Sequence, residues 1–127
     1  MPLIFYVNIL LIAIGGALGS VARYLFSLSV QRAAGTLFPV GTFAVNVVGC
    51  LAFGAIAGAT EQRVQLDPAV RMLLLVGLLG GFTTFSTYAF ESLSLVRDGQ
   101  FAWAAINVAG QVVGGLVGMW AGYVLTN

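Results

Sequence analysis

The sequence predicts an all-helical membrane protein with four spans, and three observations lead to this fold class. Of the 127 residues, 60% are hydrophobic and only 7% are charged, whereas a soluble surface needs about a quarter to a third of its residues charged. About 20 apolar residues cross a bilayer, so the length allows about four spans with short loops. Turn-forming and charged residues interrupt the apolar runs between them. We therefore predict one four-helix transmembrane domain over residues 1–127.

The composition also argues against several classes of function. The formal net charge of +1 gives no basic footprint for nucleic acid. The chain has no histidine and one cysteine, so metal clusters, disulfide frameworks and histidine-based catalysis are poorly supported. No Lys or Arg precedes Arg23, so the N-terminal run lacks the basic region of a signal peptide. We expect neither an enzyme nor a nucleic-acid partner.

The first predicted span covers residues 3–30. Gly15 and Gly19 form a small-xxx-small pair, as do the residues that follow each of them, and such pairs let helix backbones approach closely in lipid. Arg23 follows within the same apolar run. The connection after this span contains glycine and proline, which are typical of a turn.

The second predicted span covers residues 40–60 and has one strongly polar residue at its centre, Asn46. Thr42 lies one turn earlier, on the same helix face. The following loop ends in Asp67 and Pro68. Asp as an N-cap with Pro at the first helical position predicts that the next helix starts there.

The third predicted span covers residues 68–96 and changes character at its centre. Gly80 and Gly81 weaken a helix, because each glycine costs about 1 kcal/mol relative to alanine. Residues 83–87 then carry four hydroxyls. Irregular backbone at membrane depth is tolerated only where protein buries it or where it lines a cavity. We expect a broken helix here, and such breaks are typical of ion or substrate sites.

The fourth predicted span covers residues 101–125. Glycines recur in it every fourth residue, at positions Gly110, Gly114, Gly118 and Gly122. This row predicts close packing against another helix. Asn107 and Gln111 are four residues apart and so share one face of the span.

The charges in the loops give almost no orientation signal. With four spans, Arg63 and Arg71 lie on one side of the membrane, and Arg32 and Arg97 lie on the other, with Arg23 deeper in the first span. An excess of Lys and Arg on one side is needed to fix orientation. Either the chain inserts both ways round, which permits an antiparallel dimer, or other factors orient it.

The polar residues within the spans suggest an anion path or, alternatively, contacts between helices. They are nearly all neutral: Thr42, Asn46, Thr83, Thr84, Ser86, Thr87, Tyr88, Asn107 and Gln111. Neutral donors can bind an anion without holding it as a buried lysine would, and conduction needs such weak binding. Phe85 and Tyr88 share a face, and the edges of their rings are electropositive. Hydrogen bonding between helices explains the same residues without any ion.

Three ordered motifs resemble the Fluc (CrcB) family of fluoride channels. These are GGALGSVARY at 15–24, GTFAVNVVG at 41–49 and GGFTTFSTY at 80–88. The resemblance covers essentially the whole chain. It implies an antiparallel dual-topology homodimer with two pores, which passively exports fluoride across a bacterial cytoplasmic (inner) membrane and protects the cell from fluoride toxicity.

The resemblance also implies roles for particular residues. Asn46 is similar to the family's pore asparagine and Phe85 to the first ring of its phenylalanine box. The backbone carbonyls of Gly80 and Thr83, from both subunits, match those that hold a central sodium ion. Arg23 resembles a vestibule arginine, although an arginine that extends to the membrane surface explains it equally well. The polar-track positions correspond to Thr42, Ser86 and Thr87.

The chain departs from the family pattern at two places. Tyr88 stands where a second phenylalanine is usual, so its hydroxyl either donates to fluoride or is bound elsewhere. Asn107 and Gln111 fall where the family often has Tyr or Ser, so they are candidates for the pore lining, with hydrogen bonding between helices as the alternative.

Two other functions are compatible with four spans and short loops. A small dual-topology multidrug or cation transporter needs a membrane-embedded carboxylate in its first span for proton exchange, and residues 3–30 contain none. A membrane assembly subunit without transport activity needs only the glycine rows.

Overall fold

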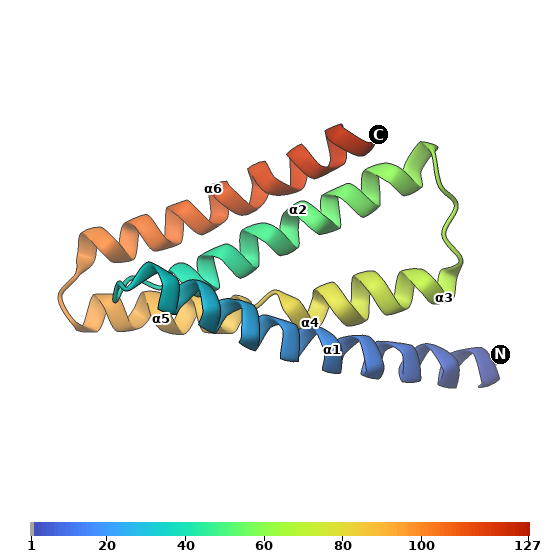
Figure 1. Cartoon of the computed structure of the whole chain (residues 1–127), viewed down its shortest axis with the longest axis horizontal. Helices are drawn as coiled ribbons and strands as arrows, with labels where there is room; N and C mark the ends of the chain where they lie inside the picture. The colour runs from blue at the N-terminus through green and yellow to red at the C-terminus, as the bar shows by residue number, and fades with distance from the viewer. Residues whose placement is uncertain (1) are drawn as a thin grey trace.

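The computed structural model describes residues 2–127, and all regular secondary structure in that range is helical (Figure 1). The elements are α1 (Pro2–Ala34), α2 (Val40–Gln62), α3 (Pro68–Arg71), the π-helix η1 (Met72–Leu79), α4 (Gly80–Phe82), α5 (Phe85–Arg97) and α6 (Phe101–Thr126). Four helical stretches in this range are long and apolar enough to cross a membrane, and elements α3 to α5 together form the third of them. The prediction of an all-helical chain with four potential spans is confirmed.

The third span is assembled from several short elements. It begins as the sequence predicts, because the Asp67 side chain accepts a hydrogen bond of 2.8 Å from the Ala69 N–H and Pro68 occupies the first turn. The π-helix η1 follows, which the sequence did not predict. Thr83 and Thr84, between α4 and α5, have extended backbone conformations.

The irregular backbone lies beyond the two glycines that were expected to weaken the helix. Gly80 and Gly81 are the first two residues of the short helix α4. Gly81 lies so close to α1 that a Cβ atom there would be 2.7 Å from the carbonyl oxygen of Gly16. Gly81 therefore permits close helix packing, and the extended residues come after it.

The helices form two packed pairs (Figure 1). α2 packs along α6, and α1 packs along η1 and α4. The beginning of α1, the end of α6 and the α2–α3 connection lie at one end of the molecule, and the α1–α2 and α5–α6 connections lie at the other. Arg63 and Arg71 are thus near one end, while Arg32 and Arg97 are near the opposite end.

The glycine row of α6 packs against α2, as the sequence predicts. A Cβ on Gly122 would overlap the carbonyl oxygen of Leu51, and one on Gly110 would be 2.8 Å from the Phe43 ring. α2 contributes glycines of its own, since a Cβ on Gly54 would overlap the backbone of α6. The two backbones come into contact where glycines meet the opposite backbone, as at Gly54 and Gly122, whereas Gly110 accommodates the Phe43 ring.

Large apolar side chains are mostly on the outside of the chain. The buried hydrophobic residues are few: Val45, Leu79, Tyr88, Leu95 and Ala104. Leucine, valine and aromatic side chains of α1 and α6 are exposed along most of both helices. Such a surface suits lipid or another apolar partner rather than water.

The contact between α1 and the third span gives a matched pair of substitutions. A Cβ on Gly19 would overlap the carbonyl oxygen of Leu78, whereas a Cβ on Gly16 meets nothing within 4 Å. We predict that Gly19→Ala lowers the free energy of unfolding in detergent by about 1–3 kcal/mol, because α1 must move away. Gly16→Ala should leave it unchanged or raise it slightly, since alanine favours the helix. Equal stabilities of the two variants would contradict the close packing at Gly19.

Candidate functional site

Asn46 bridges the extended backbone of the third span. Its Oδ1 accepts a hydrogen bond of 2.8 Å from the Thr84 N–H, and its Nδ2 donates one of 3.1 Å to the Thr84 carbonyl. Thr84 is buried, and buried peptide groups need partners. One side chain of α2 therefore satisfies both peptide groups of a residue that has left the helix.

Further amides extend this contact across the molecule. The Asn46 Nδ2 also donates to Gln111 Oε1 at 2.7 Å, and Gln111 Nε2 donates to Asn107 Oδ1 at 2.9 Å. Asn107 Nδ2 donates to the hydroxyl of Ser92 at 2.9 Å, which in turn donates to the Tyr88 carbonyl at 2.8 Å. We call this series from Asn46 to Ser92 the amide chain; it connects α2, α6 and α5.

Thr84 is also the N-cap residue of α5, which starts at Phe85. Its hydroxyl accepts a hydrogen bond of 3.2 Å from the Thr87 N–H, which is the N-cap contact of this helix. The same hydroxyl donates to the Thr87 hydroxyl at 2.9 Å. Ser86 and Thr87 are exposed. The hydroxyl-rich segment thus caps a helix as well as presenting polar groups on its surface.

Phe85 and Tyr88 form an aromatic pair on the first turn of α5. Their ring centroids are 5.4 Å apart and the ring planes are inclined at 53°. Phe85 is 78% exposed and Tyr88 only 8% exposed. The Tyr88 hydroxyl donates to the Val108 carbonyl of α6 at 3.3 Å. In this structure the hydroxyl is therefore held by α6, and Phe85 is the ring that faces outward.

A groove runs between α2, α6 and the start of α5. It has a volume of about 380 Å³ and is lined by residues that include Asn46, Thr83, Phe85, Tyr88 and Gln111. Cys50 and several apolar residues of α6 complete its walls. The groove brings together the aromatic pair and the first two members of the amide chain.

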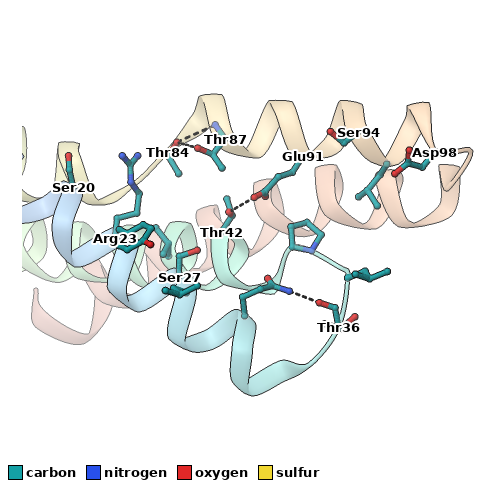
Figure 2. A pocket seen from close by; sticks show the side chains of 17 residues that line it. Ser20, Arg23, Ser27, Thr36, Thr42, Thr84, Thr87, Glu91, Ser94 and Asp98 are labelled. Atoms are coloured by element: carbon teal, nitrogen blue, oxygen red, sulfur yellow. Dashed lines mark hydrogen bonds between the residues drawn. The ribbon is translucent and has the colours of Figure 1, made fainter.

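A larger cleft lies on the other side of Thr84, between α1, the start of α2 and α5 (Figure 2). Its volume is about 660 Å³. Arg23 and Thr42 line it together with Thr87. In Figure 2 the Arg23 side chain extends from α1 towards the start of α5, where Thr84 and Thr87 lie.

Glu91 also lines this cleft, and it lies near the end of the third predicted span. The Thr42 hydroxyl donates to Glu91 Oε1 at 2.9 Å (Figure 2). The other carboxylate oxygen, Oε2, is buried and has no hydrogen-bond partner among residues 2–127. The available signal was that Glu91 is an acidic residue several residues inside an apolar run, which is costly unless it has a function.

The expected site residues are thus divided between two cavities. Asn46, Phe85, Tyr88 and Gln111 line the groove, while Arg23, Thr42 and Thr87 line the cleft. Thr84 lines both and separates them. Ser86, Asn107 and Gly80 line neither of the two, and Asn107 is fully buried at 0% exposure.

Side chains that commonly ligate metals do not cluster in residues 2–127. No group of three or more His, Cys, Asp or Glu residues in this part of the chain is placed to hold a metal ion.

Comparisons with known proteins agree on one family. A family model described as CrcB-like protein, Camphor Resistance (CrcB), matches residues 10–123. A fluoride-specific ion channel FluC from Maridesulfovibrio salexigens is 52% identical over 114 residues, which are 84% of this chain and 90% of the relative. Its counterpart from Nitratidesulfovibrio vulgaris is 52% identical over 115 residues, which are 91% and 93% of the two chains. The counterpart from Geobacter sulfurreducens is 47% identical over the same shares.

The bridge from Asn46 to Thr84 leads to a prediction about stability. Asn46→Leu keeps the branched shape and the number of side-chain heavy atoms but leaves both peptide groups of Thr84 without partners. Each unpaired buried group costs about 1–3 kcal/mol, so the free energy of unfolding in detergent should fall by about 2–6 kcal/mol. Val48→Leu, at an exposed position of the same helix, should change it little. If both variants unfold like the unmodified chain, Asn46 does not support the extended segment.

Proposed function

This chain belongs to the CrcB family, and from that membership we propose that it is a fluoride-specific ion channel. It is a multi-pass bacterial membrane protein with four spans, and it is a channel rather than an enzyme. The observation that carries the proposal is its 52% identity to channels of that name over almost their whole length. Passive export of fluoride across the cytoplasmic membrane would protect the cell from fluoride toxicity.

The groove has the chemistry that a small hard anion requires. The edges of the Phe85 and Tyr88 rings are electropositive, and both rings border the groove beside the Asn46 amide. These groups carry no net charge, so they attract an anion without holding it permanently. We assign the fluoride path to Phe85, Tyr88 and Asn46, with Thr42, Ser86 and Thr87 as further polar positions along it.

Arg23 places one positive charge in the cleft, which is also lined by the acidic residues Glu91 and Asp98. The cleft opens between α1, α2 and α5 near the α1–α2 connection, and Arg23 lines it half-buried. A guanidinium in a partly enclosed space raises the local concentration of anions. We therefore propose that the cleft is the vestibule of the channel.

The channel would be an antiparallel, dual-topology homodimer with two pores. Phe85 is 78% exposed on a single chain, so the groove is open on the side where the ring projects. A second subunit would close it and cover the apolar surface around it. The arginines at the two ends of the molecule are balanced, which is compatible with insertion in both orientations.

A sodium ion would have a structural role between the two subunits. The oxygen ligands proposed for it are the carbonyls of Gly80 and Thr83. Thr83 is extended, with φ −82° and ψ 153°, so its carbonyl is outside a helix. Backbone carbonyls at such irregular positions coordinate alkali cations in membrane proteins. Two carbonyls from one chain are few for a cation, so both subunits would contribute, and the bound charge would hold them together.

The alternative of a small multidrug or cation transporter has no support in the comparisons. The relatives described above are named as fluoride channels. In addition, α1 contains no acidic residue with which to exchange protons.

The function is tested by fluoride efflux from liposomes that contain the purified protein, followed with a fluoride-selective electrode. The unmodified chain should release fluoride and retain chloride. Phe85→Ile should slow fluoride efflux at least about tenfold, because it removes the ring edge and keeps apolar bulk. Phe90→Ile alters another exposed ring of α5 that lines neither cavity and should leave efflux unchanged. Normal efflux through Phe85→Ile would exclude the ring-edge role.

The sodium proposal predicts that the side chain of Thr83 matters little. Thr83→Ser keeps the backbone carbonyl and also the hydroxyl that donates to the Leu79 carbonyl at 3.1 Å. We expect efflux within about twofold of the unmodified chain, with the same dependence on sodium. A large loss of efflux in this variant, in protein that remains folded, would point to a side-chain role for Thr83 and against coordination by its carbonyl.

A further inference from the structure

The donors of the amide chain all point in one direction, and the backbone sets that direction. A peptide N–H can only donate, so the Asn46 side chain must turn Oδ1 towards the Thr84 N–H. Its Nδ2 then faces Gln111, which must offer its oxygen. Gln111 consequently presents Nε2 to Asn107, which accepts through Oδ1. Each amide orientation follows from the one before it.

The Ser92 end of the amide chain follows the same rule. Since Asn107 accepts through Oδ1, its Nδ2 is directed towards the Ser92 hydroxyl at 2.9 Å. That hydroxyl accepts from Asn107 and gives its own proton to the Tyr88 carbonyl. The peptide of Thr84 and the carbonyl of Tyr88, on the first turn of α5, are thereby connected through α6.

The amide chain is closed to solvent over most of its length. Asn107 is fully buried, and Gln111 and Ser92 are buried as well. A buried polar group that loses its partner keeps the cost of its desolvation, and linked hydrogen bonds polarise one another. Removal of any member therefore disturbs its neighbours as well as its own contact.

We propose that Asn107 and Gln111 are positioning residues, which hold the Asn46 amide and the first turn of α5 in place and do not bind the permeating ion. Asn107 lines neither cavity. Gln111 borders the groove, and the amide chain orients its side chain, because Oε1 accepts from Asn46 and Nε2 donates to Asn107. In this proposal Asn107 lies outside the groove and Gln111 borders it, and both determine where Phe85 and Asn46 stand. The proposal rests on the channel function only for its flux measurement.

A double-mutant cycle separates positioning from ion binding. Gln111→Met removes both polar ends of the side chain at similar length. Ser92→Ala removes the hydroxyl at the end of the amide chain, and Ser92 lines neither cavity. We expect each variant to slow fluoride efflux about tenfold, the effect of one ordinary buried hydrogen bond. The double variant should also be about tenfold slower, because the residues act as one unit.

If Gln111 and Ser92 acted independently, the fluoride efflux rates of the variants would follow a different pattern. If Gln111 binds the ion and Ser92 only packs α5, the two losses multiply to about a hundredfold, and the proposal fails. It fails also if Ser92→Ala has no effect. Ser92→Thr restores the hydroxyl and should recover most of the efflux; a loss as large as that of Ser92→Ala would assign the effect to packing. Val113→Ala, at an exposed position of α6, is the matched control and should conduct normally.

Hydrogen–deuterium exchange tests the role of the amide chain without a measurement of fluoride efflux. The Thr84 N–H is protected by Asn46 Oδ1, so Gln111→Met and Ser92→Ala should each speed its exchange several-fold, while Val113→Ala should not. Unchanged exchange in Gln111→Met would overturn the proposal. If the unmodified protein passes no fluoride, the channel function fails, and the exchange rates alone decide whether the amide chain positions Thr84.

Discussion

The structure depends on a single constraint, which is that peptide groups leaving a helix inside a bilayer must find partners there. Asn46 meets this constraint for Thr84 by accepting from its N–H and donating to its carbonyl. Because one residue of α2 does this, the third span can adopt extended backbone at Thr83 and Thr84. The start of α5, the exposure of Phe85 and the separation of the groove from the cleft all follow from where that contact lies.

Small residues allow this arrangement to be compact. Gly19 of α1 and Gly122 of α6 each face a backbone carbonyl of a neighbouring helix, so the helices approach more closely than side chains would permit. At that separation, short amide side chains reach from one helix to the next. The glycines and the amides are therefore complementary: close packing brings Asn46, Gln111 and Asn107 within hydrogen-bonding distance of one another.

Local signals in the sequence predicted the parts of the fold that local chemistry determines. The helix start at Asp67 and the packing of the α6 glycine row were both predicted and are confirmed. The π-helix Met72–Leu79 was not predicted, because a run of leucine, valine and methionine has no local feature that favours it over an α-helix. The partners of Asn46 and Glu91 lie 38 and 49 residues away along the chain, and spacing alone does not reveal such pairs.

The contact between Asn46 and Gln111 joins residues that are 65 apart in sequence, and this separation bears on how the protein is made. Gln111 is on α6, which leaves the ribosome after α1, α2 and the third span. Until α6 has entered the bilayer, the Asn46 amide and the interrupted third span remain only partly paired. α6 thus supplies a polar contact that the earlier spans lack, and a chain that stalls before α6 is left with a costly, incompletely bonded segment in lipid.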